Sequence, residues 1–266
     1  MSATLTVTVE AVLGSGARMH EVPDASVSLV LTSPPYFSES TEERLREGRL
    51  DHEQSAALRA ETEALALSLR PVFRACERVL VRGGHLVVQT RDVRLADGLV
   101  PVEGIHRQMI EARGLRLLTR HLWRPAFETL ARRQLRDSWA RQALPMPFDP
   151  EVFLVFERAG PRYRGEPTAA DLDLLQADIM VSGKGYLPAA HRFQAPVPVL
   201  EALVRTWTRP GDRVVDPFMG GGTTLMVARS LGRSAWGCDV DPAAVALARR
   251  NLGLGTPIEC GVANHV

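Results

Sequence analysis

The sequence has little lysine, little cysteine and no long apolar run. Lys184 is the only lysine among the 32 basic residues, so arginine supplies nearly all of the positive charge. The basic residues almost cancel 31 acidic ones, and a net charge of +1 by itself favours no nucleic-acid or membrane partner. The three cysteines, Cys76, Cys238 and Cys260, form no CxxC pair, so the sequence predicts neither a disulfide framework nor a metal site.

Membrane and export signals are also missing. No apolar stretch approaches the roughly 20 residues that cross a bilayer, and residues 1–10 show no basic segment followed by an apolar one. Widely spaced cysteines fit a reducing compartment, so we expect a cytoplasmic protein without a membrane partner. An apolar fraction of 45% over 266 residues allows a sizeable core, in one large α/β domain or two small ones.

The positive charge is concentrated in one part of the chain. Residues 113–141 hold eight arginines against Glu128 and Asp137, a local excess of six positive charges. Such a segment can be a solvated helix face or an anion-binding face, and both interpretations stay open.

Apolar patterning predicts alternating strands and helices along most of the chain. Strands are expected at 4–13, 27–32, 85–90, 115–123, 151–157, 212–218 and 234–240. Helices are expected within 52–80 (one, or two broken near Pro71, ended by the glycines of 82–84), at 102–114, within 125–149 and 195–208, and at 223–232 and 242–252. Residues 159–190 look like an irregular insertion. This alternation predicts an α/β fold with a mostly parallel sheet and helices on both faces.

A glycine-rich loop lies between an expected strand and an expected helix, in "VVDPFMGGGTT" (214–224). Glycines there let the backbone approach a ligand, and the following helix presents free N–H groups to it. Asp239 ends the next expected strand, where an acidic side chain can accept both hydroxyls of a ribose. The pattern predicts a nucleoside site, and the alternative is a glycine turn with a capping aspartate.

The expected nucleoside does not resemble a dinucleotide. The spacing is not GxGxxG, no Lys or Arg lies within 214–228, and Asp216 would repel a phosphate. An acidic group instead suits an ammonium, while Thr223 and Thr224 at the helix start can donate hydrogen bonds to a carboxylate. S-adenosylmethionine combines adenosine, an ammonium and a carboxylate, so it is the favoured ligand.

A second motif interrupts the apolar run "LVLTSPPYF" (29–37). Proline removes ladder donors and fixes the backbone, so Pro34 and Pro35 do not belong in a central strand. A tight turn followed by a buried tyrosine is the simplest explanation, although a turn would need only one proline.

The two motifs together resemble those of a known family. "DPFMGGGTT" is similar to the cofactor motif of bacterial DNA amino-methyltransferases, commonly DPFxGSGTT, and "TSPPYF" is similar to their catalytic motif in the serine form most often associated with cytosine N4 methylation. "ACERVLVRGGHLVVQTRDV", "HLWRP", "EVFLVFER" and "AHRFQAPVP" resemble the family's further blocks, so the resemblance spans nearly the whole chain. The catalytic motif comes first, which is the permuted order of the β class.

The resemblance implies a circularly permuted, Rossmann-like methyltransferase fold in one domain, 1–266, with a target-recognition region embedded at 125–190. The implied activity is site-specific DNA methylation, from S-adenosylmethionine to the N4 amine of a flipped-out cytosine. Methylation of adenine N6, amine methylation of RNA and a catalytically silent nucleic-acid-binding module stay open as alternatives. Double-stranded DNA is the implied partner, and a cognate restriction endonuclease and a homodimer are open.

The chemistry explains why a stiff turn would be catalytic. An exocyclic amine is a poor nucleophile because its lone pair is delocalised into the ring, and acceptors on its N–H bonds localise that pair in the transition state. The Ser33 hydroxyl and the Pro34 carbonyl can be these acceptors, with the turn stiffened by Pro35. Tyr36, backed by Phe37, offers a flat face to an extruded base.

The resemblance also assigns the remaining site residues. The expected cofactor-binding residues are Asp216, Pro217, Phe218, Gly220, Gly222, Thr223, Thr224, Asp239, His191 and Ser15. Ser15 replaces an acidic residue that members often carry after the first strand, and His191 is expected to shape the cofactor pocket or cap the next helix. The expected nucleic-acid contacts are Arg124, Arg132, Arg133, Arg136 and Lys184.

Overall fold

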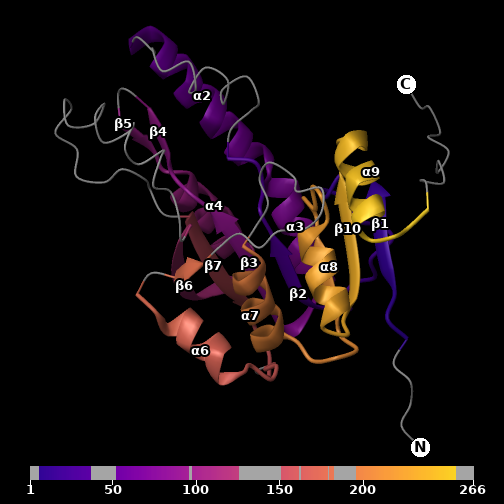
Figure 1. The fold of residues 1–266 in the computed structure, drawn as a ribbon. Helices are drawn as coiled ribbons and strands as arrows, with labels where there is room; N and C mark the ends of the chain where they lie inside the picture. The colour runs from indigo at the N-terminus through magenta and orange to yellow at the C-terminus, as the bar shows by residue number, and fades with distance from the viewer. Residues whose placement is uncertain are drawn as a thin grey trace, which may run out of the picture.

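The computed structural model describes residues 6–36, 52–95, 98–125, 151–161, 163–178, 180–182 and 196–255 (Figure 1). Its strands are β1 (Val9–Leu13), β2 (Val27–Thr32), β3 (Leu80–Thr90), β4 (Val93–Leu95), β5 (Gly98–Val100), β6 (Leu115–Pro125), β7 (Glu151–Arg158), β8 (Met180–Ser182), β9 (Arg213–Asp216) and β10 (Ser234–Asp239). Its helices are α2 (His52–Ser68), α3 (Arg70–Val79), α4 (Val102–Glu111), α6 (Ala169–Gln176), α7 (Val197–Trp207), α8 (Thr223–Ser230) and α9 (Pro242–Asn251).

Eight of these strands form one sheet in the order β1-β10-β9-β2-β3-β7-β6-β8, while β4 and β5 pair separately. The neighbours from β1 to β3 are all parallel, β7 is antiparallel to both β3 and β6, and β8 is parallel to β6. Within this sheet β7 therefore runs against the other strands. The predicted α/β fold with a mostly parallel sheet is confirmed.

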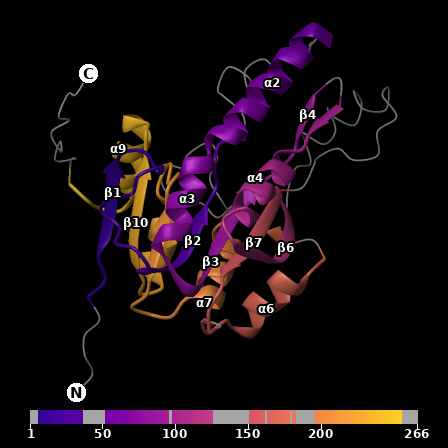
Figure 2. The same ribbon diagram turned by 180° about the vertical axis from the view of Figure 1, so that it is seen from behind.

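Helices pack on both faces of the sheet, as Figures 1 and 2 show from opposite sides. One apolar core joins the strands to buried residues of α6, α7, α8 and α9, such as Leu175, Leu203 and Ala248. The other joins them to α3 and α4 through residues such as Phe73 and Ile110. All six residues of β2 are buried, as the continuous apolar run "VSLVLT" predicts for a strand covered on both sides.

Before residue 101 the structure decides one open alternative and corrects the sequence prediction in two places. The helical segment is two helices, α2 and α3, as the alternative with a break near Pro71 predicted, and Pro71 occupies the first turn of α3. The glycines of 82–84 lie inside β3 as a bulge, since Val27 pairs with Leu80 but Leu29 pairs with His85. The β4–β5 hairpin over 93–100 was not expected, and the helix expected within 125–149 falls almost wholly outside the described residues.

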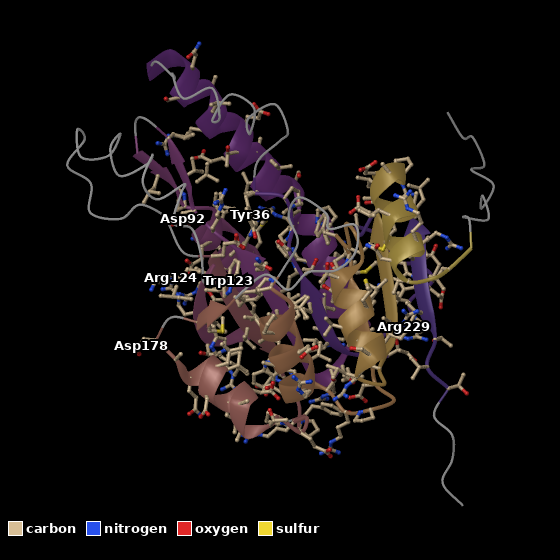
Figure 3. All side chains as sticks on the ribbon, in the orientation of Figure 1. Tyr36, Asp92, Trp123, Arg124, Asp178 and Arg229 are labelled. Atoms are coloured by element: carbon tan, nitrogen blue, oxygen red, sulfur yellow. The ribbon has the colours of Figure 1, made fainter. Side chains whose placement is uncertain are left out.

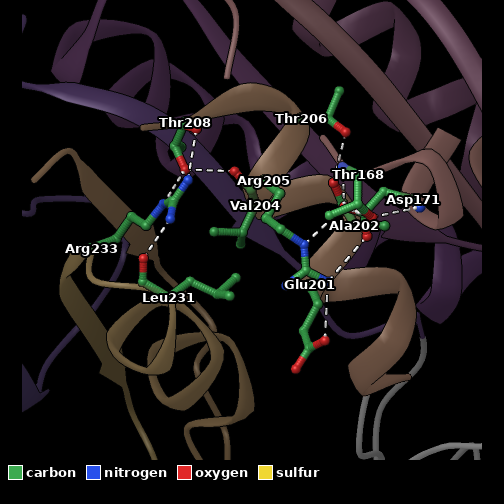
Figure 4. A network of polar contacts seen from close by, with 10 residues as sticks. All are labelled: Thr168, Asp171, Glu201, Ala202, Val204, Arg205, Thr206, Thr208, Leu231 and Arg233. Carbon is green, nitrogen blue, oxygen red and sulfur yellow. Dashed lines mark hydrogen bonds and ion pairs between the residues drawn. The ribbon is translucent and has the colours of Figure 1, made fainter. Parts of the chain in front are cut away.

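The expected irregular insertion at 159–190 contains a helix and a strand, α6 and β8. Thr168 caps α6 by accepting from the Asp171 N–H, and the Asp171 carboxylate accepts from the Thr168 N–H in return. Arg205 of α7 then donates to both Asp171 oxygens, at 2.8 and 3.1 Å, which fastens α6 to α7 (Figure 4). The T-x-x-D signal was visible in the sequence, but the surrounding Gly, Pro and Ala concealed it.

Candidate active site

The carboxyl ends of β2, β9 and β10 lie next to one another in the sheet. β2 pairs with β9 through Val30 and Val215, and β9 pairs with β10. At this edge the Thr32 hydroxyl donates to Asp216 Oδ1 at 2.7 Å across 184 residues of sequence. The strand leading into Ser33 and the strand ending at Asp216 therefore lie side by side, at the edge where open α/β sheets bind ligands.

Asp216 is buried beneath this edge, with 4% of its surface exposed. Its carboxylate accepts hydrogen bonds from Thr32, from the Phe218 N–H at 3.1 Å and from Thr224. Burial nevertheless raises the pKa of this carboxyl from 3.8 to about 6. Thr224 was expected to face a ligand carboxylate, but its hydroxyl is engaged with Asp216 instead.

The glycine loop after β9 is folded onto Asp239. The Gly220 N–H donates to Asp239 Oδ2 at 3.0 Å, and the Met219 N–H donates to the Cys238 carbonyl at 3.1 Å. Gly222 is the N-cap of α8 with a φ of +82°, and a Cβ there would lie 3.0 Å from Ala248 Cβ. The loop thus needs glycine at 222 both for its backbone conformation and for its contact with α9.

Asp239 is half-buried at the end of β10 and keeps capacity for a ligand. Its Oδ1 accepts from the Asp241 N–H and its Oδ2 from the Gly220 N–H, each at 3.0 Å. A carboxylate oxygen can accept two hydrogen bonds, so each oxygen retains an acceptor position for a ribose hydroxyl. Leu13, its register partner in β1, and the following Val240 are 54% and 73% exposed.

The loop after β1 closes the same site from the other side. Gly14 N–H donates to the Asp239 carbonyl at 2.9 Å, and Ser15 Oγ accepts from the Ala17 N–H at 3.3 Å. A Cβ on Gly16 would lie 2.6 Å from Pro217 Cβ, so only glycine permits this approach to the glycine loop after β9. Ser15 is therefore placed beside the glycine loop, with its side chain exposed.

The Ser-Pro-Pro-Tyr turn continues from β2 at this edge. Pro34 is buried, Pro35 is exposed, and Ser33 and Tyr36 are half-buried. The Ser33 and Tyr36 hydroxyls lie 3.0 Å apart, a contact that the sequence did not indicate. Burial of the Tyr36 hydroxyl, with the nearby Glu151 carboxylate, raises its pKa above the usual range.

Three residues at this turn were missed by the sequence analysis. Glu151, the first residue of β7, accepts a hydrogen bond from the Tyr36 hydroxyl and another from the buried Gln89 Nε2. The Arg91 guanidinium lies 5.6 Å from the centre of the Tyr36 ring. Gln89 is polar within an otherwise buried apolar strand, which was a visible signal, whereas nothing in "EVFLVFE" marked Glu151.

The remaining predicted residues are divided between the surface and the undescribed segments. Arg124 is exposed near the end of β6, beside the buried Trp123 (Figure 3). Those outside the described residues are Phe37, Arg132, Arg133, Arg136, Lys184 and His191. In the described part of the chain no group of His, Cys, Asp and Glu could hold a metal ion, and no helix is long and apolar enough to cross a membrane.

Comparisons with known proteins point to one chemistry. Residues 131–250 match the family described as DNA methylase (N6_N4_Mtase). The type II methyltransferase M.MjaI of Methanocaldococcus jannaschii is 28% identical over 96% of this chain and 94% of its own length.

Solved structures agree with this family match. A proposed DNA modification methylase of Thermus thermophilus, TTHA0409, solved with S-adenosyl-L-methionine, is 26% identical with a TM-score of 0.66, over 93% of this chain and 95% of that one. The PvuII DNA methyltransferase (cytosine-N4-specific) shares the fold with a TM-score of 0.70 at 18% identity, over 96% and 89% of the two chains. Together these matches support a DNA amino-methyltransferase of the methyltransferase fold, with S-adenosylmethionine as its methyl donor.

Proposed function

We propose that this chain is a β-class, permuted DNA methyltransferase that methylates the N4 amine of an extruded cytosine. The observation that carries the proposal is the position of the Ser33 hydroxyl. It follows β2, the strand that pairs with β9, and β9 leads directly into the cofactor loop. The serine form of the motif favours cytosine, and methylation of adenine N6 is the competing outcome.

The residues around the glycine loop fit S-adenosylmethionine. Asp239 retains one acceptor position on each oxygen for the two ribose hydroxyls, and the exposed Leu13 and Val240 beside it offer apolar surface to an adenine ring. The N-terminus of α8 suits the carboxylate of the methionine portion. Buried Asp216 supplies a negative charge that favours its ammonium. The other proposed contacts are Ser15, Pro217, Phe218, Gly220, Gly222, Thr223, Thr224 and His191.

When bound, S-adenosylmethionine supplies an electrophilic methyl group whose sulfur–carbon bond breaks as the amine nitrogen's lone pair forms the new nitrogen–carbon bond, leaving a neutral thioether. The chain's task is to hold the amine in line and to make its nitrogen electron-rich. Ser33 Oγ and the Pro34 carbonyl would accept the two N–H bonds, in a turn stiffened by Pro35. The Tyr36 ring would stack on the base; Arg91 lies over one face, so stacking would use the other.

DNA would be bound by arginines beyond the sheet edge. Arg124 is exposed near the end of β6, immediately before the proposed target-recognition region, residues 125–190. Arg132, Arg133, Arg136 and Lys184 fall within that region. Reversing the charge of Arg132 and Arg133 together should weaken DNA binding and flatten its dependence on salt, because each lost phosphate contact reduces the slope by about 0.9. An unchanged slope would remove these arginines from the interface.

The reaction is tested by identifying the methylated product. The chain is incubated with labelled S-adenosylmethionine and duplex DNA, the DNA is digested to nucleosides, and the products are separated by mass spectrometry. N4-methylcytosine supports the proposal, whereas N6-methyladenine would show that the target base is adenine and not cytosine. Label found in RNA alone, or cofactor binding without transfer to any nucleic acid, contradicts DNA methylation. Co-purification with a nuclease and sedimentation would test an endonuclease partner and a homodimer.

Two substitutions should separate the two halves of the site. Ser33→Ala should reduce turnover while cofactor affinity stays near wild type, because Ser33 would touch only the amine. Asp239→Ala should weaken cofactor binding by about 2 kcal/mol, roughly thirtyfold in Kd, as two charge-assisted hydrogen bonds are lost. Calorimetry with S-adenosylmethionine and single-turnover methylation measure the two effects. The reverse pattern would refute these role assignments.

A further inference from the structure

The hydrogen bonds at the catalytic turn have a fixed direction. A tyrosine hydroxyl carries one hydrogen, and an ionised carboxylate can only accept, so the bond between Tyr36 and Glu151 uses the Tyr36 hydrogen. In the 3.0 Å contact between the two hydroxyls, Ser33 must therefore be the donor. The lone pairs of Ser33 Oγ are then left to accept a hydrogen bond from the target amine. This orientation is the one that catalysis on an amine needs.

The surroundings hold the carboxylate in place. Gln89 is 5% exposed, and its Nε2 donates to Glu151 Oε2, which fixes the carboxylate between β3 and β7. Trp123 of β6 is the register partner of Glu151 and is buried. Among the charged and titratable groups at the turn, Tyr36 donates to Glu151, and the guanidinium of Arg91 after β3 lies 5.6 Å from the centre of the Tyr36 ring. On β6 the exposed Arg124 follows Trp123 in the chain.

We propose that Glu151 is a positioning residue that ends a hydrogen-bonded path from the target amine through the Ser33 and Tyr36 hydroxyls, and that it accepts the proton released on methylation. The inference rests on the proposed function, because it requires an amine at Ser33. It also gives a role to Glu151 of β7, a residue that lies outside both sequence motifs.

The path conserves protons and charge. A nitrogen that gains a methyl group carries one surplus proton, which passes to Ser33 Oγ while the Ser33 proton passes to the Tyr36 oxygen. The Tyr36 proton in turn passes to the Glu151 carboxylate, and the resulting carboxylic acid returns the proton to solvent. Both hydroxyls end neutral, so no charge is stranded in the half-buried turn.

The kinetic test compares Glu151→Gln with Glu151→Asp and a matched control. Glutamine can keep the contacts to Gln89 and Tyr36 but cannot take a proton, so the single-turnover methylation rate should fall about a hundredfold with the Kd for S-adenosylmethionine unchanged. Aspartate should restore part of the rate. Glu10→Gln, the same chemical change at an exposed residue of β1, should leave the rate unchanged. Circular dichroism checks that each variant is folded.

A second measurement needs no methylation. The Tyr36 hydroxyl donates a hydrogen bond to the Glu151 carboxylate, and donation to a carboxylate moves the absorption of a tyrosine ring to longer wavelength, so Glu151→Gln should move the Tyr36 band to shorter wavelength at neutral pH. Ultraviolet difference spectra measure this shift, and Tyr36→Phe identifies the Tyr36 contribution among the three tyrosines. Identical Tyr36 spectra in wild type and Glu151→Gln would show that the hydrogen bond is absent and would overturn the path.

The outcomes separate the path from the proposed function. An active wild type with Glu151→Gln within about threefold of its rate overturns the path alone. A rate loss matched by an equal loss of cofactor affinity also overturns it, because Glu151 would then act on the cofactor site. A wild type that methylates no DNA overturns the proposed function, and the path with it. A rate loss at constant affinity, together with the shifted Tyr36 absorption, supports the path.

Discussion

The buried carboxyl of Asp216 predicts an unusual effect of substitution on stability. Asp216 is 4% exposed, and burial raises its pKa from 3.8 to about 6 although three groups donate hydrogen bonds to it. Without a bound ligand, the ionised Asp216 carboxylate therefore lowers the stability of the folded chain. We expect Asp216→Asn to make the protein more stable at neutral pH and, at the same time, worse at binding S-adenosylmethionine.

The direction in which stability changes with pH follows from the number of protons that the folded and the unfolded chain bind. Below pH 3.8 the carboxyl is protonated in both the folded and the unfolded chain, so it has no effect on their balance. Between pH 3.8 and about 6 the unfolded chain loses this proton while the folded chain keeps it, so stability falls as the pH rises. A shift of about two units corresponds to about 3 kcal/mol, and this penalty is complete above pH 6 or so.

Asparagine removes the penalty with little change of shape. Its amide oxygen can still accept from Thr32 and from the Phe218 N–H, and the Thr224 hydroxyl can rotate to accept from the amide nitrogen. The difference in unfolding free energy between Asp216→Asn and wild type should thus increase by about 2.5 kcal/mol between pH 4, where a small part of the penalty is already present, and pH 7.5. Urea unfolding at several pH values measures it.

The control is Asp173→Asn, the same change at an exposed residue of α6, which should give a difference that does not vary with pH in this way. The functional half of the prediction is measured by calorimetry, where Asp216→Asn should weaken binding because the ligand's ammonium loses its buried counter-charge. An Asp216→Asn variant whose stability difference is the same at pH 4 and pH 7.5 would refute the account of Asp216.

Three further changes test other parts of the fold. Gly222→Ala should lower the unfolding free energy by about 2 kcal/mol, because alanine is strained at a φ of +82° and its Cβ would press on Ala248; an unchanged urea midpoint would contradict this. Arg205→Gln should cost about 2 kcal/mol and expose α6 to proteolysis, because Asp171, only 6% exposed, loses its charged partner and keeps only the donors of Thr168; protease resistance equal to wild type would count against it. Arg124→Glu should reduce the salt slope of DNA binding by about 1, and an unaltered slope would place Arg124 away from DNA.

Local sequence signals predicted most of the elements because each depends on neighbouring residues. The apolar run of β2 and the glycine loop before α8 were recognisable from composition and spacing alone. The adjacency of β2 and β9 was also predictable, since ligands in parallel sheets bind where the carboxyl ends of neighbouring strands meet. The misses were of two kinds: α6 had a visible cap at Thr168, whereas the bulge in β3 depends on its pairing with β2.

The sequence by itself determined the kind of chemistry, because the residues of each motif are consecutive and their functional groups are fixed by covalent order. It carried the serine and prolines of the turn, the three glycines and the acid at the end of β10. Only the tertiary structure decided which residues from distant parts of the chain contact these motifs. Strand order brings Thr32 to Asp216, and the reversed direction of β7 brings Glu151 to the edge where Tyr36 lies. Such contacts depend on pairing between strands far apart in the chain, and no local pattern specifies that pairing.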